Sequence, residues 1–193
     1  MNLTFDSLKP YLIAQGSERY CFRHPQKDNW IIKLSPESKS KQTLREIKYF
    51  KQLKDKNIEF SHIPNFGKTL SIPGYIGFEQ ELITDYDGTI SKQLFYYLDD
   101  KNADPTTRDI MKILEILRLY IYKNNILVCD LGGSNIVIQK FTPEKSRAVI
   151  VDGFGDTDFI PVCSYIPFLA KLKAHRRWKR FIQKFIPPHF LNK

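Results

Sequence analysis

The sequence predicts an α+β fold with two lobes: a small N-terminal β-sheet lobe with one helix, residues 1–84, and a reduced, mainly helical C-terminal lobe, residues 85–193. Two observations favour it. The first half consists of short, turn-bounded segments typical of strands, whereas long stretches of the second half have apolar residues at helical spacing. A chain of 193 residues with 42% hydrophobic side chains can form the core that such a fold needs.

Five strands and one helix are expected in the N-terminal lobe. The first two strands flank a turn at residues 16–18, and the third is the apolar segment NWIIKLS. A helix is expected from about residue 39 to residue 54, after a polar cluster that can begin it. Two further strands lie within residues 63–83, where Pro and Gly interrupt the apolar pattern before an acidic turn.

Two helices and a small hairpin are expected in the C-terminal lobe. Asp104 as N-cap and Pro105 at the first helical position begin a helix that ends near Asn124. The stretch ILVCDLGGSNIVIQ, residues 126–139, predicts a strand, a loop and a strand, and RAVIVDG predicts one more strand. The last helix is amphipathic, with its apolar residues at the spacing i, i+3, i+4, i+7: Trp178, Phe181, Ile182 and Phe185.

The formal charge of +9 is concentrated in this last helix. No acidic residue follows Asp158, and the tail contains eight basic residues, so the rest of the chain is nearly neutral. Nucleic-acid binding is therefore weakly indicated. Three interpretations stay open: a solvated face of a packed helix, a site for an anionic substrate, or contact with an anionic membrane surface. The residues that would make such contacts are Lys171, Arg176, Arg177, Lys179 and Arg180.

Other features limit the compartment and the metal chemistry. No apolar run is long enough to span a bilayer and the N-terminus lacks the pattern of a signal peptide, so a cytoplasmic protein is expected, with peripheral contact to the inner membrane as an option. Cys21, Cys129 and Cys163 are far apart, and the histidines are scattered, so a disulfide framework or a zinc site is not indicated. A hard cation bound by oxygen atoms remains open.

Polar residues occur at unexpected places in otherwise apolar elements. Lys33 lies in an apolar strand, although solvent exposure is the usual outcome for a strand lysine. Glu46 shares a helical stripe with aromatic residues, where a buried carboxylate needs a cation such as Lys33; exposure at the edge of the stripe is the alternative. Asp130 is followed five positions later by Asn135. Asp152 ends a strand before a sharp glycine turn, which an ordinary strand-ending turn would also explain.

Taken in order, these residues match the parts of a kinase phosphoryl-transfer site. Phosphoryl transfer needs a cation for the α- and β-phosphates of ATP and oxygen ligands for Mg²⁺. Lys33 would be that cation, oriented by Glu46. Asn135 and Asp152 would hold Mg²⁺, and Asp130 would accept or orient the proton of the attacking hydroxyl. The sequence thus predicts ATP and Mg²⁺ as cofactors.

The chain also resembles the PhoP regulatory network protein YrbL family, whose members are classed with the protein-kinase-like fold. The blocks that resemble it include GSERYCFRHP, TLREIKYFKQL, VIVDGFGDTDFIP and the closing RRWKRFI. The resemblance implies ATP in a cleft between two lobes. The amides of Gly16, Ser17, Glu18 and Arg19 would contact phosphate, the backbone from Glu81 through Ile83 to Thr84 would meet adenine, and Asp85 or Asp87 would lie near the ribose. The family name itself specifies no reaction.

Departures from protein kinases decide the substrate class. Val128 and Cys129 replace the His-Arg pair, and the phosphate loop has the single Gly16. Only 41 residues follow Asp152, too few for a peptide-binding platform. The favoured function is an ATP-dependent phosphotransferase with a non-protein hydroxyl acceptor, such as a cell-envelope sugar or lipopolysaccharide-type glycolipid; a cytosolic sugar or an aminoglycoside-like acceptor fits the same residues.

Two other classes of function stay open. An ATP-binding pseudokinase with a regulatory or adaptor role fits the single glycine of the phosphate loop. A basic module that binds nucleic acid or anionic membrane would depend on the C-terminal charges instead. Neither the acceptor nor the oligomeric state follows from the sequence.

Overall fold

The computed structural model of the chain describes residues 3–99, 103–156 and 167–187. Asp158 and Cys163, two residues considered in the sequence analysis, lie outside these ranges. The chain is mixed α and β and divides into two compact units. Unit 1 comprises residues 1–60 and 64–82, and unit 2 comprises residues 61–63 and 83–193.

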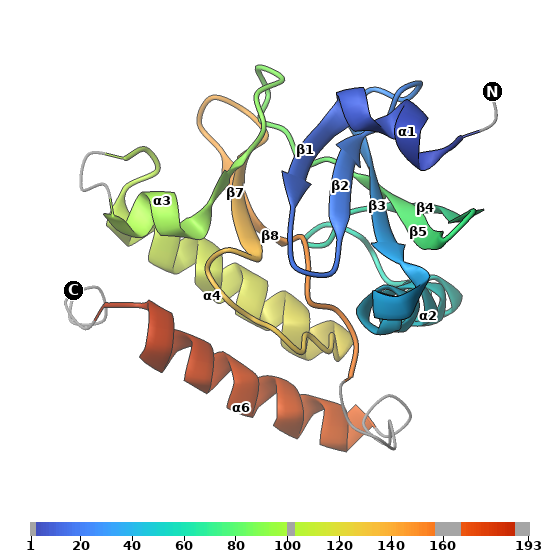
Figure 1. Ribbon diagram of the computed structural model, residues 1–193. Helices are drawn as coiled ribbons and strands as arrows, with labels where there is room; N and C mark the ends of the chain where they lie inside the picture. Colours follow the sequence, from blue (N-terminus) through green and yellow to red (C-terminus); the bar gives the residue numbers. More distant parts are fainter. Residues whose placement is uncertain (1–2, 100–102, 157–166, 188–193) are drawn as a thin grey trace. The chain divides into compact units, whose positions relative to one another are not determined.

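Unit 1 is built on an antiparallel five-stranded sheet with strand order β1-β2-β3-β5-β4 (Figure 1). Its strands are β1 (Leu12–Gln15), β2 (Tyr20–Arg23), β3 (Trp30–Pro36), β4 (Phe66–Ile72) and β5 (Tyr75–Glu81). Its main helix is α2 (Lys41–Asp55), which is preceded by the short elements α1 (Phe5–Leu8), η1 (Lys9–Tyr11) and η2 (Glu37–Lys39). The five strands and the helix predicted for the first half are therefore confirmed.

The central strand β3 is buried on both of its faces. On one face, a cluster that includes Leu8, Phe22 and Ile32 packs with the ring of Phe5, which stacks on Tyr75 at 4.4 Å between centroids. On the other face, Phe50 of α2 packs on Phe66 of β4, and Phe66 packs on Phe78 of β5. Burial from both sides explains why β3 lacks a solvent-facing row of polar residues.

Among its described residues, unit 2 has a three-stranded antiparallel sheet and the helices α3, α4 and α6 (Figure 1). The strands are β6 (Lys92–Gln93), β7 (Ile136–Lys140) and β8 (Ser146–Ile150) in that spatial order. The helices are α3 (Leu94–Asp99), α4 (Thr107–Asn124) and α6 (Pro167–Phe185). Helix α4 contacts both β8 and α6, so it is the central helix of this unit. None of the helices in the described ranges has the length and apolar composition that a bilayer span requires.

The start of α4 differs from the prediction. The helix begins at Thr107, and its N-cap is Thr106, whose hydroxyl accepts a hydrogen bond from the backbone N–H of Asp109 at 3.4 Å. Asp104 does not cap the helix, because its carboxylate pairs with the ammonium of Lys140 at 2.6 Å. A threonine two residues after the predicted cap satisfies the same geometric need for an oxygen acceptor.

The first strand predicted within residues 126–139 is also wrong. Only a single bridge, between Val128 and Phe154, forms there, and the strand β7 begins at Ile136. The segment is instead bonded to the turn that follows Asp152. The N–H of Cys129 donates a hydrogen bond to Gly153 O at 2.7 Å, and the N–H of Gly155 donates one to Leu127 O at 2.9 Å. This segment is apolar because it is buried, with Ile126 and Leu127 almost inaccessible to solvent.

Candidate functional site

The loop between Asp130 and Asn135 is closed by the side chain of Asn135. Its Nδ2 donates to the backbone O and to the carboxylate Oδ2 of Asp130, at 2.9 Å in each case. The backbone N–H of Asn135 donates to Gly132 O at 3.0 Å. Because Nδ2 donates to Asp130, the carboxamide atom left to bind a cation is Oδ1.

Gly132 and Gly133, the two glycines of this loop, do not have positive φ angles. At position 133 a glycine is needed because of packing. A Cβ added there would lie 2.6 Å from Cε1 of the Phe95 ring. Such a distance is far below van der Waals contact, so any side chain would displace the loop or the ring. The close approach of α3 to the loop therefore explains the glycine that the sequence interpretation attributed only to a tight turn.

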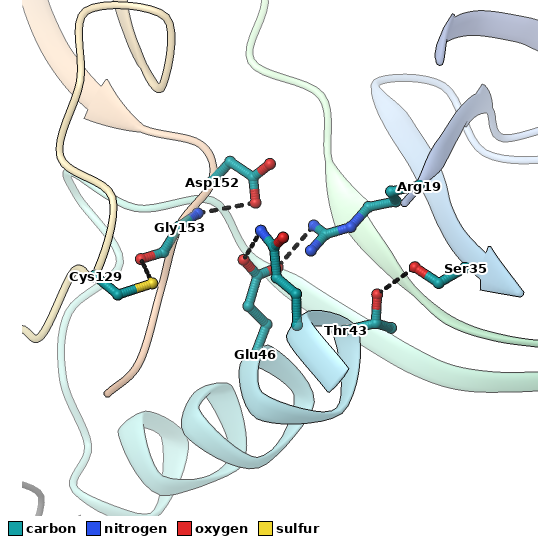
Figure 2. A network of polar contacts seen from close by, with 8 residues as sticks. Arg19, Ser35, Thr43, Glu46, Cys129, Asp152 and Gly153 are labelled. Atoms are coloured by element: carbon teal, nitrogen blue, oxygen red, sulfur yellow. Dashed lines mark hydrogen bonds and ion pairs between the residues drawn. The ribbon is translucent and has the colours of Figure 1, made fainter. Parts of the chain in front are cut away.

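Asp152 lies on a turn that is bonded to the same loop. Gly153 O accepts hydrogen bonds from the N–H of Cys129 at 2.7 Å and from the N–H of Asp130 at 3.4 Å. It also accepts one from Cys129 Sγ at 3.1 Å (Figure 2). The N–H of Val151 donates to Asn135 O at 2.9 Å. The structure thus brings together three predicted residues of unit 2, Asp130, Asn135 and Asp152, by fixing their backbones to one another.

The sharp turn expected after Asp152 is present. Gly153 and Gly155 have φ angles of 80° and 94°, in the region that favours glycine. The N–H of Gly153 donates to Asp152 Oδ1 at 2.8 Å, and a Cβ on Gly153 would lie 2.8 Å from Asp130 O. Gly153 is therefore required both for the turn and for the close approach to Asp130.

The oxygen atoms of this network suit a hard cation. Two carboxylates and one carboxamide match Mg²⁺, which uses few protein ligands and keeps water and substrate oxygens in its remaining positions. Within the part of the chain that the structure describes, no group of three or more His, Cys, Asp or Glu residues could hold a metal. A site for Mg²⁺ here would accordingly depend on oxygen atoms from phosphate, and the residues Asn135 and Asp152 fit that role.

In unit 1, Glu46 is fully buried and pairs with Arg19. The guanidinium Nη1 donates to Glu46 Oε2 at 2.8 Å, and Gln42 Nε2 lies 3.5 Å from Oε1 (Figure 2). The alternative of an exposed glutamate is therefore wrong. Arg19 was predicted only for its backbone amide, and no sequence spacing links it to Glu46, because the two residues are 27 positions apart. Arg19 directly precedes β2 and Glu46 lies on α2, so the packing of α2 on the sheet brings them together.

Lys33 is also buried, with 6% of its surface exposed, so the alternative of a solvent-facing strand lysine is wrong. Its ammonium lies 5.9 Å from the centroid of the Phe78 ring, and the guanidinium of Arg19 lies at the same distance from that centroid. Two cations and the Glu46 carboxylate are thus grouped inside unit 1. A buried cation of this kind suits the neutralisation of phosphate charge.

The turn predicted to contact phosphate joins β1 to β2. The N–H of Gly16 donates to Arg19 O at 2.8 Å, which closes the turn, and Ser17 O accepts from the ammonium of Lys39 at 3.4 Å. Ser17 and Glu18 are exposed at its tip. The Gly16 amide is therefore already used within the turn, while the tip is accessible.

The segment predicted to meet adenine has most of its described polar groups in use. Glu81 Oε2 accepts from the backbone N–H and the Nδ2 of Asn65 at 2.9 and 2.7 Å. Thr84 O accepts from Gln139 Nε2 at 2.7 Å. The side chain of Ile83 packs in unit 2 with Val137 and Val149, an apolar cluster that Val151 extends. The segment thus contributes Ile83 to the buried core of unit 2.

Asp85 and Asp87 fold the following loop back on itself. Asp85 Oδ1 accepts from Ser91 Oγ at 2.5 Å and from the N–H of Lys140 at 2.9 Å. Asp87 Oδ1 accepts from the N–H and the hydroxyl of Thr89, and these hydrogen bonds lower the pKa of the Asp87 carboxyl. Asp85 and Asp87, which the family resemblance places near a ribose, thus stabilise the loop of unit 2 that contains them.

Tyr97 gives a test of electrostatics at high pH. It is 3% exposed, and burial, followed by the charge of Asp85, raises its pKa from 10.0 to about 12. Between these values the folded protein keeps a proton that the unfolded chain loses, so from about pH 9 to about pH 11 the free energy of unfolding should fall by about 1 kcal/mol after allowance for solvent screening. Urea denaturation at about pH 9 and about pH 11 should show a smaller fall for Tyr97→Phe than for wild type. An equal fall in both proteins would contradict this assignment.

Helix α6 presents one buried and one basic face. Trp178 and Phe181 are buried, which confirms the amphipathic pattern, and the exposed face carries Lys171, Arg176, Lys179 and Arg180. Arg177 is different, because its Nη1 donates to Val128 O at 2.7 Å. This arginine supports the backbone two residues before Asp130.

A buried ion pair between Lys173 and Asp156 also anchors α6. The side-chain exposures are 9% and 2%, so neither charge is solvated. Sequence reasoning missed both residues as site-supporting groups. Asp156 ends the segment DGFGD, but only the folded chain shows that its partner lies on the last helix.

Comparison with known proteins identifies the family. The family model of the PhoP regulatory network protein YrbL matches residues 7–186. The chain belongs to this family. It is 25% identical over 173 residues to the "Uncharacterized protein YrbL" of Escherichia coli strain K12 and, with the same values, to that of Shigella flexneri, covering 88% of this chain and 82% of each relative. Membership in the YrbL family connects the chain with the PhoP regulatory network by name.

Proposed function

We propose that this YrbL family member is an ATP-dependent phosphotransferase of the protein-kinase-like superfamily, acting on a hydroxyl of a non-protein acceptor. The observation that carries the proposal is the network in unit 2 that links Asp130, Asn135 and the turn of Asp152. A carboxylate held by a carboxamide, beside a second carboxylate on a glycine turn, is the donor set that kinases use to orient a hydroxyl and hold Mg²⁺.

In this proposal Asp130 orients the acceptor hydroxyl and receives its proton. The Asn135 amide fixes the Asp130 carboxylate through the 2.9 Å hydrogen bond, so the group needs little reorganisation. Asn135 Oδ1 and the carboxylate of Asp152 would hold Mg²⁺, which when bound supplies neutralisation of phosphate charge. Gly153 keeps the two carboxylate-bearing segments in register.

Unit 1 would supply the cation for the α- and β-phosphates. Lys33 is the proposed residue, and the buried pair of Glu46 and Arg19 gives it a fixed electrostatic surrounding. The sheet order of unit 1, with one helix between the third and fourth strands of the chain, supports a kinase-like N-terminal lobe. The fold assignment rests on this order and on the position of the Lys and Glu residues in it.

The acceptor is proposed to be a sugar hydroxyl of an anionic envelope glycolipid. The exposed face of α6 has cations at residues 171, 176, 179 and 180, and it adjoins the exposed apolar side chains of Phe168 and Leu172. Cations beside apolar side chains are the composition that binds an anionic membrane surface. Peripheral attachment would place the enzyme beside such an acceptor.

Neutralising this face should release the protein from anionic vesicles. The triple substitution of Arg176, Lys179 and Arg180 to Gln should weaken binding to vesicles of mixed anionic and neutral phospholipid by about 100-fold, at roughly 1 kcal/mol per charge. Lys41, Lys48 and Lys51 on α2 are exposed, and the same change there provides a control of equal charge. Vesicle flotation measures both. Equal losses in the two triple variants would show nonspecific attraction instead of a surface on α6.

The catalytic proposal is tested by ATP binding and turnover together. Thermal denaturation is followed with ATP, with Mg²⁺ and with both, and release of inorganic phosphate is measured in parallel. ATP with Mg²⁺ at about 100 times its Kd should stabilise the protein by about 2.7 kcal/mol. Slow hydrolysis would support the phosphotransferase, and the absence of any ATP effect would overturn it.

A pseudokinase is the second candidate, and one observation favours it. The Gly16 amide, which a phosphate loop would direct at ATP, is hydrogen-bonded within its own turn. A pseudokinase would show stabilisation by ATP without turnover, even when candidate acceptors such as envelope sugars are supplied. The same pair of measurements therefore separates the two candidates.

A further inference from the structure

Unit 2 contains a pocket of about 440 Å³ that is separate from the network of Asp130, Asn135 and Asp152. It lies where the loop after Ile83, helix α3 and the end of β7 meet, and α3 contacts β7 (Figure 1). Its lining includes three carboxylates, two tyrosines and the lysine at the end of β7: Asp85, Asp87, Asp104, Tyr96, Tyr97 and Lys140. All of its lining residues belong to one unit.

The two lysines of the pocket lining, Lys92 and Lys140, already interact with other lining residues. The ammonium of Lys140 pairs with Asp104 at 2.6 Å, and that of Lys92 lies 3.7 Å from the centroid of the Tyr96 ring. The two remaining carboxylates, of Asp85 and Asp87, accept hydrogen bonds through Oδ1 from neutral groups. The lining therefore has an excess of negative charge, which disfavours an anionic ligand.

Tyr97 adds a hydroxyl that is available to a ligand in the pocket. The residue is 3% exposed overall and belongs to the pocket lining. A hydroxyl at the wall of a pocket can bond to a ligand in place of water. The hydroxyl stays protonated at neutral pH, because its pKa is raised to about 12, and it can donate as well as accept.

We propose that this pocket binds a monosaccharide unit that is neutral or carries an amino group. Carboxylate oxygens accept hydrogen bonds from adjacent sugar hydroxyls or from an ammonium, and the Tyr97 hydroxyl can donate to a ring or hydroxyl oxygen. The pocket volume falls in the range of small-molecule sites. The inference does not rest on the proposed phosphotransferase, since none of its residues belongs to the Asp130 loop or the Asp152 turn.

Saturation-transfer NMR on the full chain tests the proposal with D-glucosamine, D-glucose and D-glucose 6-phosphate at millimolar concentration. Glucosamine and glucose should receive saturation and glucose 6-phosphate should receive less. Tyr97→Phe keeps the ring and should weaken glucosamine binding at least about fivefold, the loss expected for one hydrogen bond. Tyr122→Phe removes a hydroxyl that lies outside the pocket, 3.1 Å from His175 Nδ1, and should leave binding unchanged.

Three results would overturn the proposal. One is no saturation of any of the three sugars, and another is preferential binding of the phosphorylated sugar. The third is binding that survives both Tyr97→Phe and Asp87→Asn, since it would lie elsewhere. Addition of ATP separates this site from a nucleotide site: glucosamine should stay bound, whereas displacement would assign the pocket to the ribose of ATP. An inactive protein that still binds glucosamine would refute only the phosphotransferase.

Discussion

Asp152→Asn is expected to abolish the Mg²⁺-dependent part of the stabilisation by ATP and to lower phosphate transfer by about 10³-fold. Asn retains the size of the side chain and an oxygen that can accept the 2.8 Å hydrogen bond from the Gly153 N–H, so the turn should persist. It removes the negative charge that would hold Mg²⁺. Thermal denaturation with ATP, with and without Mg²⁺, and phosphate release measure the two effects.

Asp55→Asn is a matched control for this change. Asp55 is exposed at the end of α2 and has no role in the proposed site, so ATP binding and turnover should stay at the wild-type level. If Asp152→Asn bound ATP and Mg²⁺ as tightly as wild type and turned over at the same rate, the metal role of Asp152 would be refuted. A loss of turnover with Mg²⁺ binding intact would instead indicate a role in orienting phosphate.

The local elements of unit 1 could be predicted because each is encoded by a short-range pattern. The helix α2 has apolar residues at helical spacing, and the strands are bounded by glycine and proline. The short helix α1 was missed, since four residues give no periodic signal; its evidence is the reciprocal bonding of Thr4 and Ser7. Likewise α3 and the two-residue strand β6 are fixed by packing rather than by their own sequence.

The candidate site was predictable only as a set of residue types. Asp130 and Asn135 are five positions apart, and the hydrogen bond between them follows from a local loop. The supporting contacts are not local: Arg19, beside β2, reaches Glu46 on α2, and Arg177 reaches Val128 from the last helix. Such pairs depend on how separate elements pack, which spacing along a chain does not encode.

The buried pair of Arg19 and Glu46 leads to the largest expected change in stability. The side chains are 10% and 0% exposed, and their atoms lie 2.8 Å apart. Arg19→Met leaves a buried carboxylate without this cation and should lower the free energy of unfolding by about 3 kcal/mol, because desolvation of the charge is no longer offset. Urea denaturation measures the loss. Arg19→Lys should recover part of it, since the positive charge returns without the planar guanidinium.

The double variant separates the charge from the packing of Arg19. Glu46→Gln in the Arg19→Met background removes the buried negative charge that has lost Arg19, so the double variant should be more stable than Arg19→Met alone and the two effects should not be additive. Lys9→Met is the control for an exposed pair, because Lys9 and Asp6 are 62% and 84% exposed and their solvent-screened pairing should leave the free energy of unfolding nearly unchanged. Additive losses from Arg19→Met and Glu46→Gln would mean that the pair is not coupled. In that case the burial of Glu46 would have to be offset by its other neighbours, and its proposed role in orienting Lys33 would need a different electrostatic basis.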